Sequence, residues 1–199
     1  FNPKNAYAMS KYTQEMIAIN LGKRYEIPTV GMRYSIVQGP RQSFYNAYSG
    51  ACRIFCLSLY FDQQLLVYED GQQLRDYVNI HDVVDANLLV LEDSRADYEV
   101  FGVGGDQGYT VVEFADIVAQ VYGKEIEPRI PGVYRFGDTR HIVSDVSKLK
   151  GLGWKPQRTP KDSVAEYVAW LREQDNVEDI LDYAEKHMKK SSVLREVKG

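Results

Sequence analysis

The sequence predicts an α/β protein with a mostly parallel sheet. Short segments rich in β-branched and aromatic residues, bounded by glycine and proline, alternate along the chain with longer segments of helical apolar periodicity. The composition, 44% hydrophobic and 26% charged residues, is that of a soluble globular protein. A chain of 199 residues is long enough to bury the core of one domain or parts of two.

Helix-capping residues set the limits of the elements in the first half of the chain. Asn5 can open the first helix, with Gly22 and Pro28 closing it, and His81 and Asp82 can cap a later helix. The expected elements, by residue number, are a helix over 6–25, a strand over 29–34, a helix over 47–61, strands over 64–68 and 76–80, a helix over 83–92 and a strand over 99–103.

The second half carries clearer start and stop residues. Thr110 is an expected N-cap with Gly123 as the stop, and Thr159 is an N-cap followed by a proline at the first helical position. The expected elements are a helix over 111–122, an extended segment over 126–130, a short helix starting at 144 or 145, a helix over 160–172 and a last charged helix over 177–190.

Composition also limits the partners and the compartment. The net charge is −4 and no basic run is present, which argues against nucleic acid. No apolar run approaches the ~20 residues of a membrane helix, so a cytoplasmic protein is expected. Cys52 and Cys56 lie at helical spacing without a nearby histidine, so we expect reduced, buried cysteines and no metal site.

Tyr7 and Lys11 form a spacing that can carry chemistry. Residues four apart on a helix share one face, with Cβ atoms about 5–6 Å apart. A tyrosine and a lysine so placed can be a catalytic pair, but the same spacing also suits an exposed turn of helix. The segment 102–105, Gly-Val-Gly-Gly, follows a strand but lacks a third glycine at the right spacing, so a phosphate-binding loop there is disfavoured.

Six motifs follow one another along the chain. They are AYAMSK, MRYSIVQGPRQ, YEDGQQLRDYVNIHDVVDA, EVFGVGG, RFGDTRHIVSDVSKLKGLGWKP and AEYVAWL. This series resembles the extended short-chain dehydrogenase/reductase family, in its NAD-dependent epimerase/dehydratase branch that acts on nucleotide sugars. The resemblance implies the C-terminal part of a Rossmann-type doubly wound parallel sheet (residues 1–43 and 76–107) and a smaller α/β substrate-binding domain (44–75 and 108–199). It also implies that the glycine-rich NAD loop, the acidic ribose ligand and a catalytic Ser or Thr belong to an upstream segment, which fits a chain starting at Phe1 without a methionine.

The resemblance assigns cofactor chemistry to the first helix and the first strand. Tyr7 would take the proton of a sugar hydroxyl while hydride passes to NAD, and Lys11 would favour the phenolate and hold the nicotinamide ribose. Tyr34 matches a position beside the nicotinamide, although a core tyrosine explains it nearly as well. NADP is not excluded, because the residue that selects between the two cofactors would lie upstream.

Two further clusters are assigned to the substrate, a nucleoside-diphosphate sugar. Arg75 matches an arginine that contacts the diphosphate. The alternative for Arg75 is a salt bridge with Asp76 or Asp82. Arg135 and Asp138 match a second cluster, in which the arginine contacts phosphate and the aspartate contacts the nucleotide ribose.

Three positions nearby have other roles or depart from the family pattern. Arg140 either joins the phosphate site or is a solvated loop arginine, and His141 is expected to be structural. Ile36 replaces an asparagine that often contacts the substrate, and its aliphatic side chain cannot donate that hydrogen bond. The substrate is therefore held differently here, or the sugar is less polar.

The leading hypothesis is an NAD-dependent nucleotide-sugar 4-epimerase that forms a keto sugar transiently, is homodimeric at full length and is present here as a truncated chain. One alternative is a 4,6-dehydratase or decarboxylase of the same family. Another, of a different class, is an inactive fragment that acts at most as a nucleotide-sugar binding module. We expect no turnover from the 199-residue chain alone, because the cofactor pyrophosphate lacks its glycine-rich loop.

Overall fold

Helices and strands alternate along most of the chain in the computed structural model, which confirms the α/β prediction. The structure describes residues 5–43, 50–135, 137–181, 183, 186, 190 and 194–196. Its elements are α1 (Ala6–Tyr25), β1 (Gly31–Tyr34), β2 (Ile36–Gln38), α2 (Ala51–Tyr60), β3 (Leu74–Asn79), α3 (Ile80–Glu92), the 3-10 helix η1 (Ser94–Ala96), β4 (Val100–Val103), β5 (Gly108–Thr110), α4 (Val111–Tyr122), β6 (Val133–Arg135), α5 (Ser147–Lys150), α6 (Pro160–Arg172) and β7 (Leu194–Glu196).

The strands pair in three small sheets. β1 pairs with β4 and β2 pairs with β3, both in parallel, with Gly31 opposite Val100 and Ile36 opposite Tyr77. β5 joins the edge of β3 and β6 pairs with β7, both antiparallel. The strands β1, β3 and β4 were expected, whereas the three-residue strands β2, β5, β6 and β7 were not predicted.

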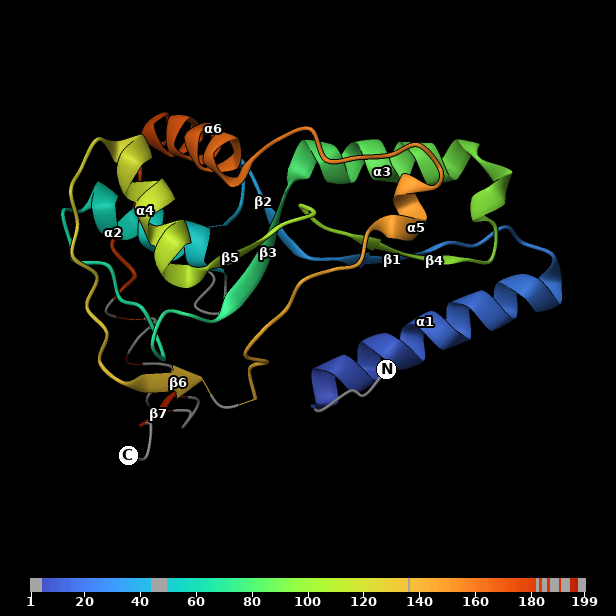
Figure 1. The fold of residues 1–199 in the computed structure, drawn as a ribbon, viewed down its shortest axis with the longest axis horizontal. Coiled ribbons are helices and arrows are strands. Elements are labelled where there is room, and N and C mark those ends of the chain that lie inside the picture. The colour runs from blue at the N-terminus through green and yellow to red at the C-terminus, as the bar shows by residue number, and fades with distance from the viewer. Residues whose placement is uncertain are drawn as a thin grey trace.

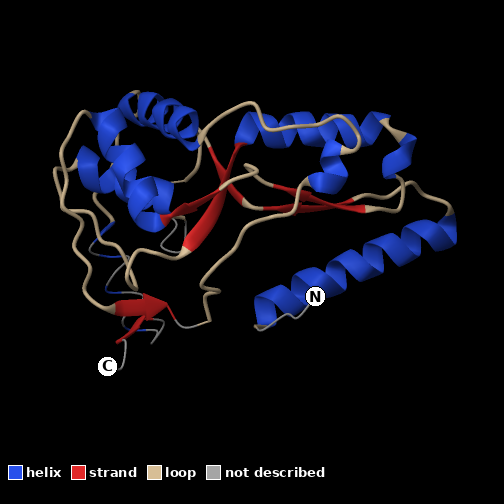
Figure 2. Cartoon of the chain, in the orientation of Figure 1, coloured by secondary structure: helices blue, strands red, loops and turns tan. Residues whose placement is uncertain are grey.

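Helices cover both faces of the β1–β4 pair. Figure 1 shows α3 and α5 on one face and α1 on the other. The helices α2, α4 and α6 gather at the opposite end of the molecule, beside β2, β3 and β5 (Figure 2). Within the described ranges, no helix is both long enough and apolar enough to cross a bilayer.

Two hydrophobic clusters meet at the β2–β3 pair. The larger cluster is formed by α2, α4 and α6 and includes Tyr77, against which Ile36 packs. The smaller cluster lies under α3 and α5 and includes Val78, against which Val37 packs. Successive residues of a strand point to opposite faces, so each of these two strands contributes to both clusters. The proposed division into two domains stays a prediction.

The best predicted elements are α4 and α6, whose observed limits agree with the expected ones. Each starts with a capping box in which the N-cap threonine and the residue three positions later bond each other's backbone. In α6, the Thr159 hydroxyl accepts from the Asp162 N–H at 3.3 Å, and the Asp162 carboxylate accepts from the Thr159 N–H at 2.8 Å. Gly123 ends α4 in a left-handed conformation with φ 66°.

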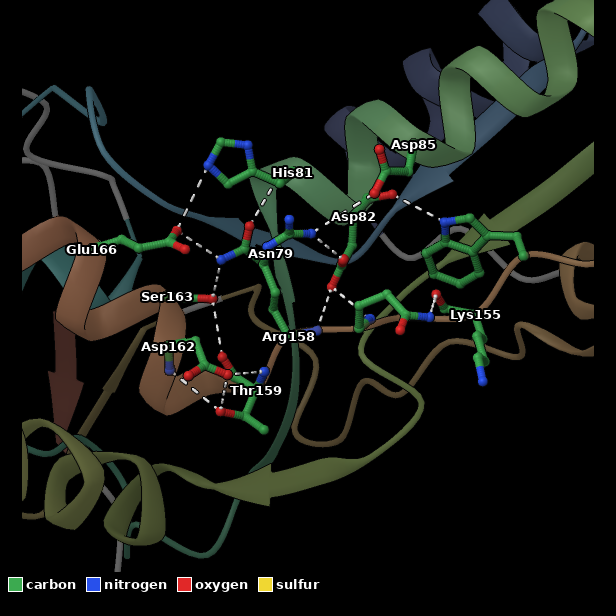
Figure 3. Close-up of polar contacts among 12 residues, drawn as sticks. Asn79, His81, Asp82, Asp85, Lys155, Arg158, Thr159, Asp162, Ser163 and Glu166 are labelled. Atoms are coloured by element: carbon green, nitrogen blue, oxygen red, sulfur yellow. Dashed lines mark hydrogen bonds and ion pairs between the residues drawn. The ribbon is translucent and has the colours of Figure 1, made fainter.

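The predicted cap of α3 was wrong. Asn79 is the N-cap, and its side chain accepts from the His81 N–H at 2.8 Å. Asp82 instead lies in the first turn of the helix, where its buried carboxylate accepts from the backbone N–H groups of Gln157 and Arg158 and pairs with the Arg158 guanidinium. Figure 3 shows these bonds, which fasten the segment before α6 to the start of α3.

The limits of α1 agree with the predicted 6–25, but the residue that ends the helix differs from the prediction. The helix runs to Tyr25, and Glu26 ends it in a left-handed conformation with φ 56°. Gly22 is therefore not the stop. It is the one buried residue of α1, where a Cβ would lie 2.3 Å from the Thr29 hydroxyl.

Three further predictions need correction. The strand over 64–68 was wrong, because this segment makes only the isolated bridge between Leu66 and Arg129. The short helix starts at Ser147 rather than 144 or 145. In the last expected helix, residues 177–180 are not helical, whereas 181, 183, 186 and 190 are; its other residues lie outside the described ones, as do 44–49 ahead of α2. The cysteines are free and buried, as predicted.

Candidate active site

Tyr7 and Lys11 lie on one face of the first half of α1. The Lys11 ammonium is 5.9 Å from the centre of the Tyr7 ring, and it also donates to the Gln14 side chain at 3.4 Å. Tyr7 is 71% exposed, so its phenol is accessible to a bound molecule. The structure therefore brings the two predicted catalytic side chains together as neighbours on the helix surface.

A double hydrogen bond fixes α1 against β1. Both Glu15 oxygens accept from the Arg33 guanidinium at 2.7 Å, and Arg33 is in β1. Glu15 belongs to the less exposed side of α1, which Ala8, Tyr12 and Ile19 share, whereas Tyr7 and Lys11 are exposed and lie beside that side. Because α1 runs back along β1, Tyr7 lies two helical turns, about 12 Å, beyond Glu15 toward the carboxyl end of the strand.

Tyr34 lies on the other face of the same sheet. Its hydroxyl donates to the Asn87 side chain of α3 at 2.9 Å, whereas its neighbour Arg33 bonds α1. The structure therefore does not bring Tyr34 into contact with Tyr7 or Lys11. It places Tyr34 at the carboxyl end of β1, on the α3 side.

The N-terminus of α1 touches the segment that carries the predicted Arg135–Asp138 cluster. The Asn5 side chain caps the helix by accepting from the Ala8 N–H at 2.8 Å, and it donates to the Gly137 carbonyl at 3.2 Å. The two residues are 132 positions apart in the chain. This one side chain therefore joins the Tyr7 end of α1 to the second predicted site.

Arg135 and Asp138 face each other across a tight turn. The Arg135 Nε lies 3.7 Å from an Asp138 carboxylate oxygen, and the Asp138 N–H donates to the Arg135 carbonyl at 3.2 Å. The Arg135 Nε is buried and has no hydrogen-bond acceptor among the described residues. A buried N–H of this kind is suited to an anionic acceptor such as a phosphate oxygen.

Arg75 adjoins the same segment from β3. Its Nη1 donates to the Leu74 carbonyl at 2.9 Å and to the Arg140 carbonyl at 2.6 Å. Neither alternative salt bridge forms, because Asp82 pairs with Arg158 and the buried Asp76 accepts from other groups. The segment 135–142 therefore links Arg75, the Arg135 cluster and the cap of the Tyr7 helix.

Asp76 is a buried residue of this region that sequence reasoning did not identify. Its carboxylate accepts from the Ser35 hydroxyl at 2.7 Å, the Gly105 N–H at 2.6 Å and the Ser144 N–H at 3.0 Å. A Cβ at Gly105 would lie 2.1 Å from the Tyr77 carbonyl, so close packing accounts for this glycine without a phosphate. The sequence around Asp76 did not indicate that its carboxylate would be buried, because its hydrogen-bond donors lie far away in the chain.

The remaining predicted positions have structural partners. His141 is an acceptor through Nδ1 for the Leu74 N–H at 3.2 Å, as expected of a structural histidine. Ile36 packs against the larger hydrophobic cluster. Trp154 is also buried, and its indole N–H donates to the Asp82 carbonyl at 3.0 Å.

Within the described part of the chain, the structure shows no metal-binding cluster, and one open pocket is not lined by the predicted site residues. No group of three histidine, cysteine, aspartate or glutamate side chains is placed to hold a metal ion within the described ranges. An open pocket of about 560 Å³ lies between the segments 105–109 and 153–160, with Lys150 at its edge. None of the predicted site residues lines that pocket.

Comparisons with known proteins identify the family of the chain. The sequence profile of the NAD dependent epimerase/dehydratase family matches residues 1–104. The dTDP-L-rhamnose 4-epimerase of Burkholderia thailandensis is 32% identical over 173 residues, which cover 86% of this chain and 47% of that protein. This chain spans about half the length of the curated relatives it matches.

Two solved structures share the fold. The UDP-glucose 4-epimerase of Thermotoga maritima, determined with UDP-glucose, is 33% identical with a TM-score of 0.77, covering 83% of this chain and 53% of that one. The UDP-glucose 4-epimerase of Thermus thermophilus, in complex with NAD, is 30% identical with a TM-score of 0.75, covering 86% and 55%. Because the family profile matches more than half of the residues and the fold agrees, this chain belongs to the NAD-dependent epimerase/dehydratase family.

Proposed function

We propose that the full-length protein containing this chain is an NAD-dependent 4-epimerase of a nucleoside-diphosphate sugar. The observation that carries the proposal is the hydrogen bond between Asn5 and Gly137, because it joins the helix of Tyr7 and Lys11 to the turn of Arg135 and Asp138. A proton-transfer group thus adjoins a phosphate-binding candidate. The 4-epimerases among the relatives support the same conclusion.

Tyr7 is proposed as the group that removes and returns the proton of the sugar hydroxyl at its Oη. An ordinary phenol has a pKa near ~10, so a nearby positive charge is needed to favour the phenolate. In this proposal the Lys11 ammonium, 5.9 Å from the centre of the Tyr7 ring, would supply that charge when cofactor and substrate are bound, and it would also hold the ribose of NAD. NAD itself supplies hydride acceptance and return when it is bound.

The exposed Tyr7–Lys11 face at the end of β1 fits a cofactor there, and Tyr34 approaches that strand end from the other face of the sheet. Tyr7, Lys11 and Tyr34 are the residues of this chain proposed to contact it. The glycine-rich loop that cradles a dinucleotide pyrophosphate has no match in this chain. We therefore propose that the 199-residue chain alone has no turnover.

The substrate is held, in this proposal, by Arg75, Arg135 and Asp138. Arginine forks match phosphate oxygens, and the buried Arg135 Nε supports a role in binding the diphosphate. Asp138 would accept from a ribose hydroxyl. Ile36 contributes packing instead of a hydrogen bond, so the polar contacts of the sugar come from other residues.

The test is turnover by the full-length protein with dTDP-L-rhamnose and UDP-glucose, followed by NMR of the sugar. Tyr7→Phe should slow epimerisation by about 10²–10⁴-fold, the contribution of positioned acid–base groups. Tyr25→Phe, at the other end of α1 and 62% exposed, is the matched control and should leave the rate unchanged.

A Tyr7→Phe protein with wild-type turnover would refute the assignment of the proton-transfer group. A product that has lost water instead of inverting C4 would show a dehydratase and overturn the epimerase proposal. Mass spectrometry distinguishes the two products, since epimerisation leaves the mass unchanged.

A further inference from the structure

The loop of residues 137–142, here called the 137–142 loop, lies along the start of β3. The Ile142 N–H donates to the Leu74 carbonyl at 3.1 Å, and the Leu74 N–H donates to the His141 Nδ1 at 3.2 Å. These two bonds set the loop beside the residue that precedes Arg75. The loop is thus fastened to β3 at its C-terminal end and to α1, through Asn5, at Gly137.

The side chain of Arg140 fastens the middle of this loop to the turn before β3. Its Nη1 donates to the Glu69 carboxylate and its Nη2 to the Asp70 carboxylate, both at 2.7 Å. The segment of Glu69 and Asp70 is also bonded to β6, since the Glu69 N–H donates to the Val133 carbonyl at 2.7 Å. The Asp70 carboxylate raises the pKa of Arg140, and Arg140 holds the pKa of Asp70 below its ordinary value, as expected of a formed ion pair.

The backbone of Arg140 contacts the predicted diphosphate ligand. Its carbonyl accepts from the Arg75 Nη1 at 2.6 Å, the shorter of the two bonds that this nitrogen makes. The orientation of the Arg75 guanidinium therefore depends on where the Arg140 carbonyl is held. Since the Arg140 side chain holds that residue against Glu69 and Asp70, the two arginines are coupled.

We infer that Arg140 is a positioning residue that orients Arg75 for binding of the substrate diphosphate. This inference rests on the proposed function, in which Arg75 contacts the diphosphate. A direct phosphate contact by Arg140 is disfavoured, because both of its terminal nitrogens already donate to carboxylates. Arg140 acts through the 137–142 loop. Its side chain fixes the loop to Glu69 and Asp70, and its carbonyl accepts from Arg75.

The experiment measures binding of dTDP and of UDP to the full-length protein by calorimetry. The variants are Arg75→Ala, Arg140→Ala, Arg140→Lys and the double alanine variant. Arg95→Ala is the matched control, because Arg95 is also an exposed arginine paired with an aspartate, and it lies outside this region. Thermal melting of each variant reports on folding.

Arg75→Ala and Arg140→Ala should each raise the Kd for dTDP and UDP about tenfold. A change of this size lies within the range of interaction energies found for residues that share one hydrogen-bond network. The double variant should bind no more weakly than Arg75→Ala, since Arg140 acts only through Arg75. Arg140→Lys should restore part of the affinity, because lysine keeps one ion pair without the fork. Arg95→Ala should bind like the wild type.

Wild-type affinity in Arg140→Ala, or losses that add in the double variant, would overturn the positioning role. If Arg140→Ala does not fold, Asp70→Asn replaces it, and unchanged binding in that variant would overturn the inference equally. Failure of the proposed function looks different, because Arg75→Ala would then bind like the wild type. In that case both the diphosphate assignment and the inference built on it are wrong.

Discussion

Replacing Asp82 by asparagine is expected to lower the free energy of unfolding by about 2–3 kcal/mol. The Asp82 side chain is 1% exposed and accepts three hydrogen bonds. One oxygen accepts from the backbone N–H groups of Gln157 and Arg158, at 3.1 and 3.0 Å, and the other accepts from the Arg158 Nη1 at 2.8 Å (Figure 3). The asparagine carbonyl can keep the two backbone bonds, but its NH₂ group then faces the guanidinium donor.

The magnitude follows from which groups lose a partner. A hydrogen bond to a charged group contributes about 1.5–3 kcal/mol, and the asparagine variant loses one such bond and opposes two donors. Asp82→Ala would cost more, about 3–5 kcal/mol, because it also leaves two backbone N–H groups without their acceptor. The Arg158 side chain is 35% exposed, so water compensates part of its loss.

The assay is urea unfolding of the wild type and each variant, with the slope m compared first to check that the unfolded state is unchanged. Asp85→Asn is the matched control. Asp85 is one turn further along α3, lies 3.7 Å from the same Arg158 nitrogen and is 57% exposed. An exposed pair of this kind contributes about 0–1 kcal/mol. The reasoning is refuted if Asp82→Asn and Asp85→Asn destabilise the protein equally.

Two further predictions concern a helix cap and a close backbone contact. Thr159→Ala should cost about 1 kcal/mol through loss of the α6 cap. The Thr159 hydroxyl and then its N–H lower the pKa of Asp162, so the stabilisation from this carboxylate is present above its unfolded pKa and disappears as the pH falls through its folded pKa. Urea titrations at pH 7 and near pH 3 should therefore show a smaller effect of Thr159→Ala in acid, and an equal effect would contradict this account. Gly105→Ala should cost about 3 kcal/mol, because its methyl would lie 2.1 Å from the Tyr77 carbonyl. Gly50→Ala meets its nearest neighbour at 3.5 Å and should cost only about 1 kcal/mol, because Gly50 is the N-cap of α2.

The sequence predicted those elements whose ends are determined locally. Both limits of α4 follow from Thr110 and Gly123, and the start of α6 follows from Thr159 and Pro160, all of them within a turn of the helix end they mark. The strand β5, by contrast, has only three residues, and its pairing partner β3 precedes it by more than 30 positions in the chain. Short strands of this kind depend on tertiary pairing rather than on local propensity.

The same distinction holds for the candidate site. The spacing of Tyr7 and Lys11 was enough to predict that they share a helix face, and their order among the other motifs indicated the family. The contact of Asn5 with Gly137 could not be predicted, since a capping asparagine gives no sign of a second partner. The carbonyl of Arg140 likewise carries no sequence signature, because every residue has one.

The pairing of β2 with β3 has a consequence for how the molecule melts. Ile36 and Tyr77 contribute to one hydrophobic cluster, while their neighbours Val37 and Val78 contribute to the other. Both hydrophobic clusters therefore pack against the same strand pair. If this pair separates when one cluster unfolds, the other cluster loses its packing as well. The two should therefore unfold as one cooperative unit, visible as a single heat-absorption peak, and two separate peaks would show that each core persists alone.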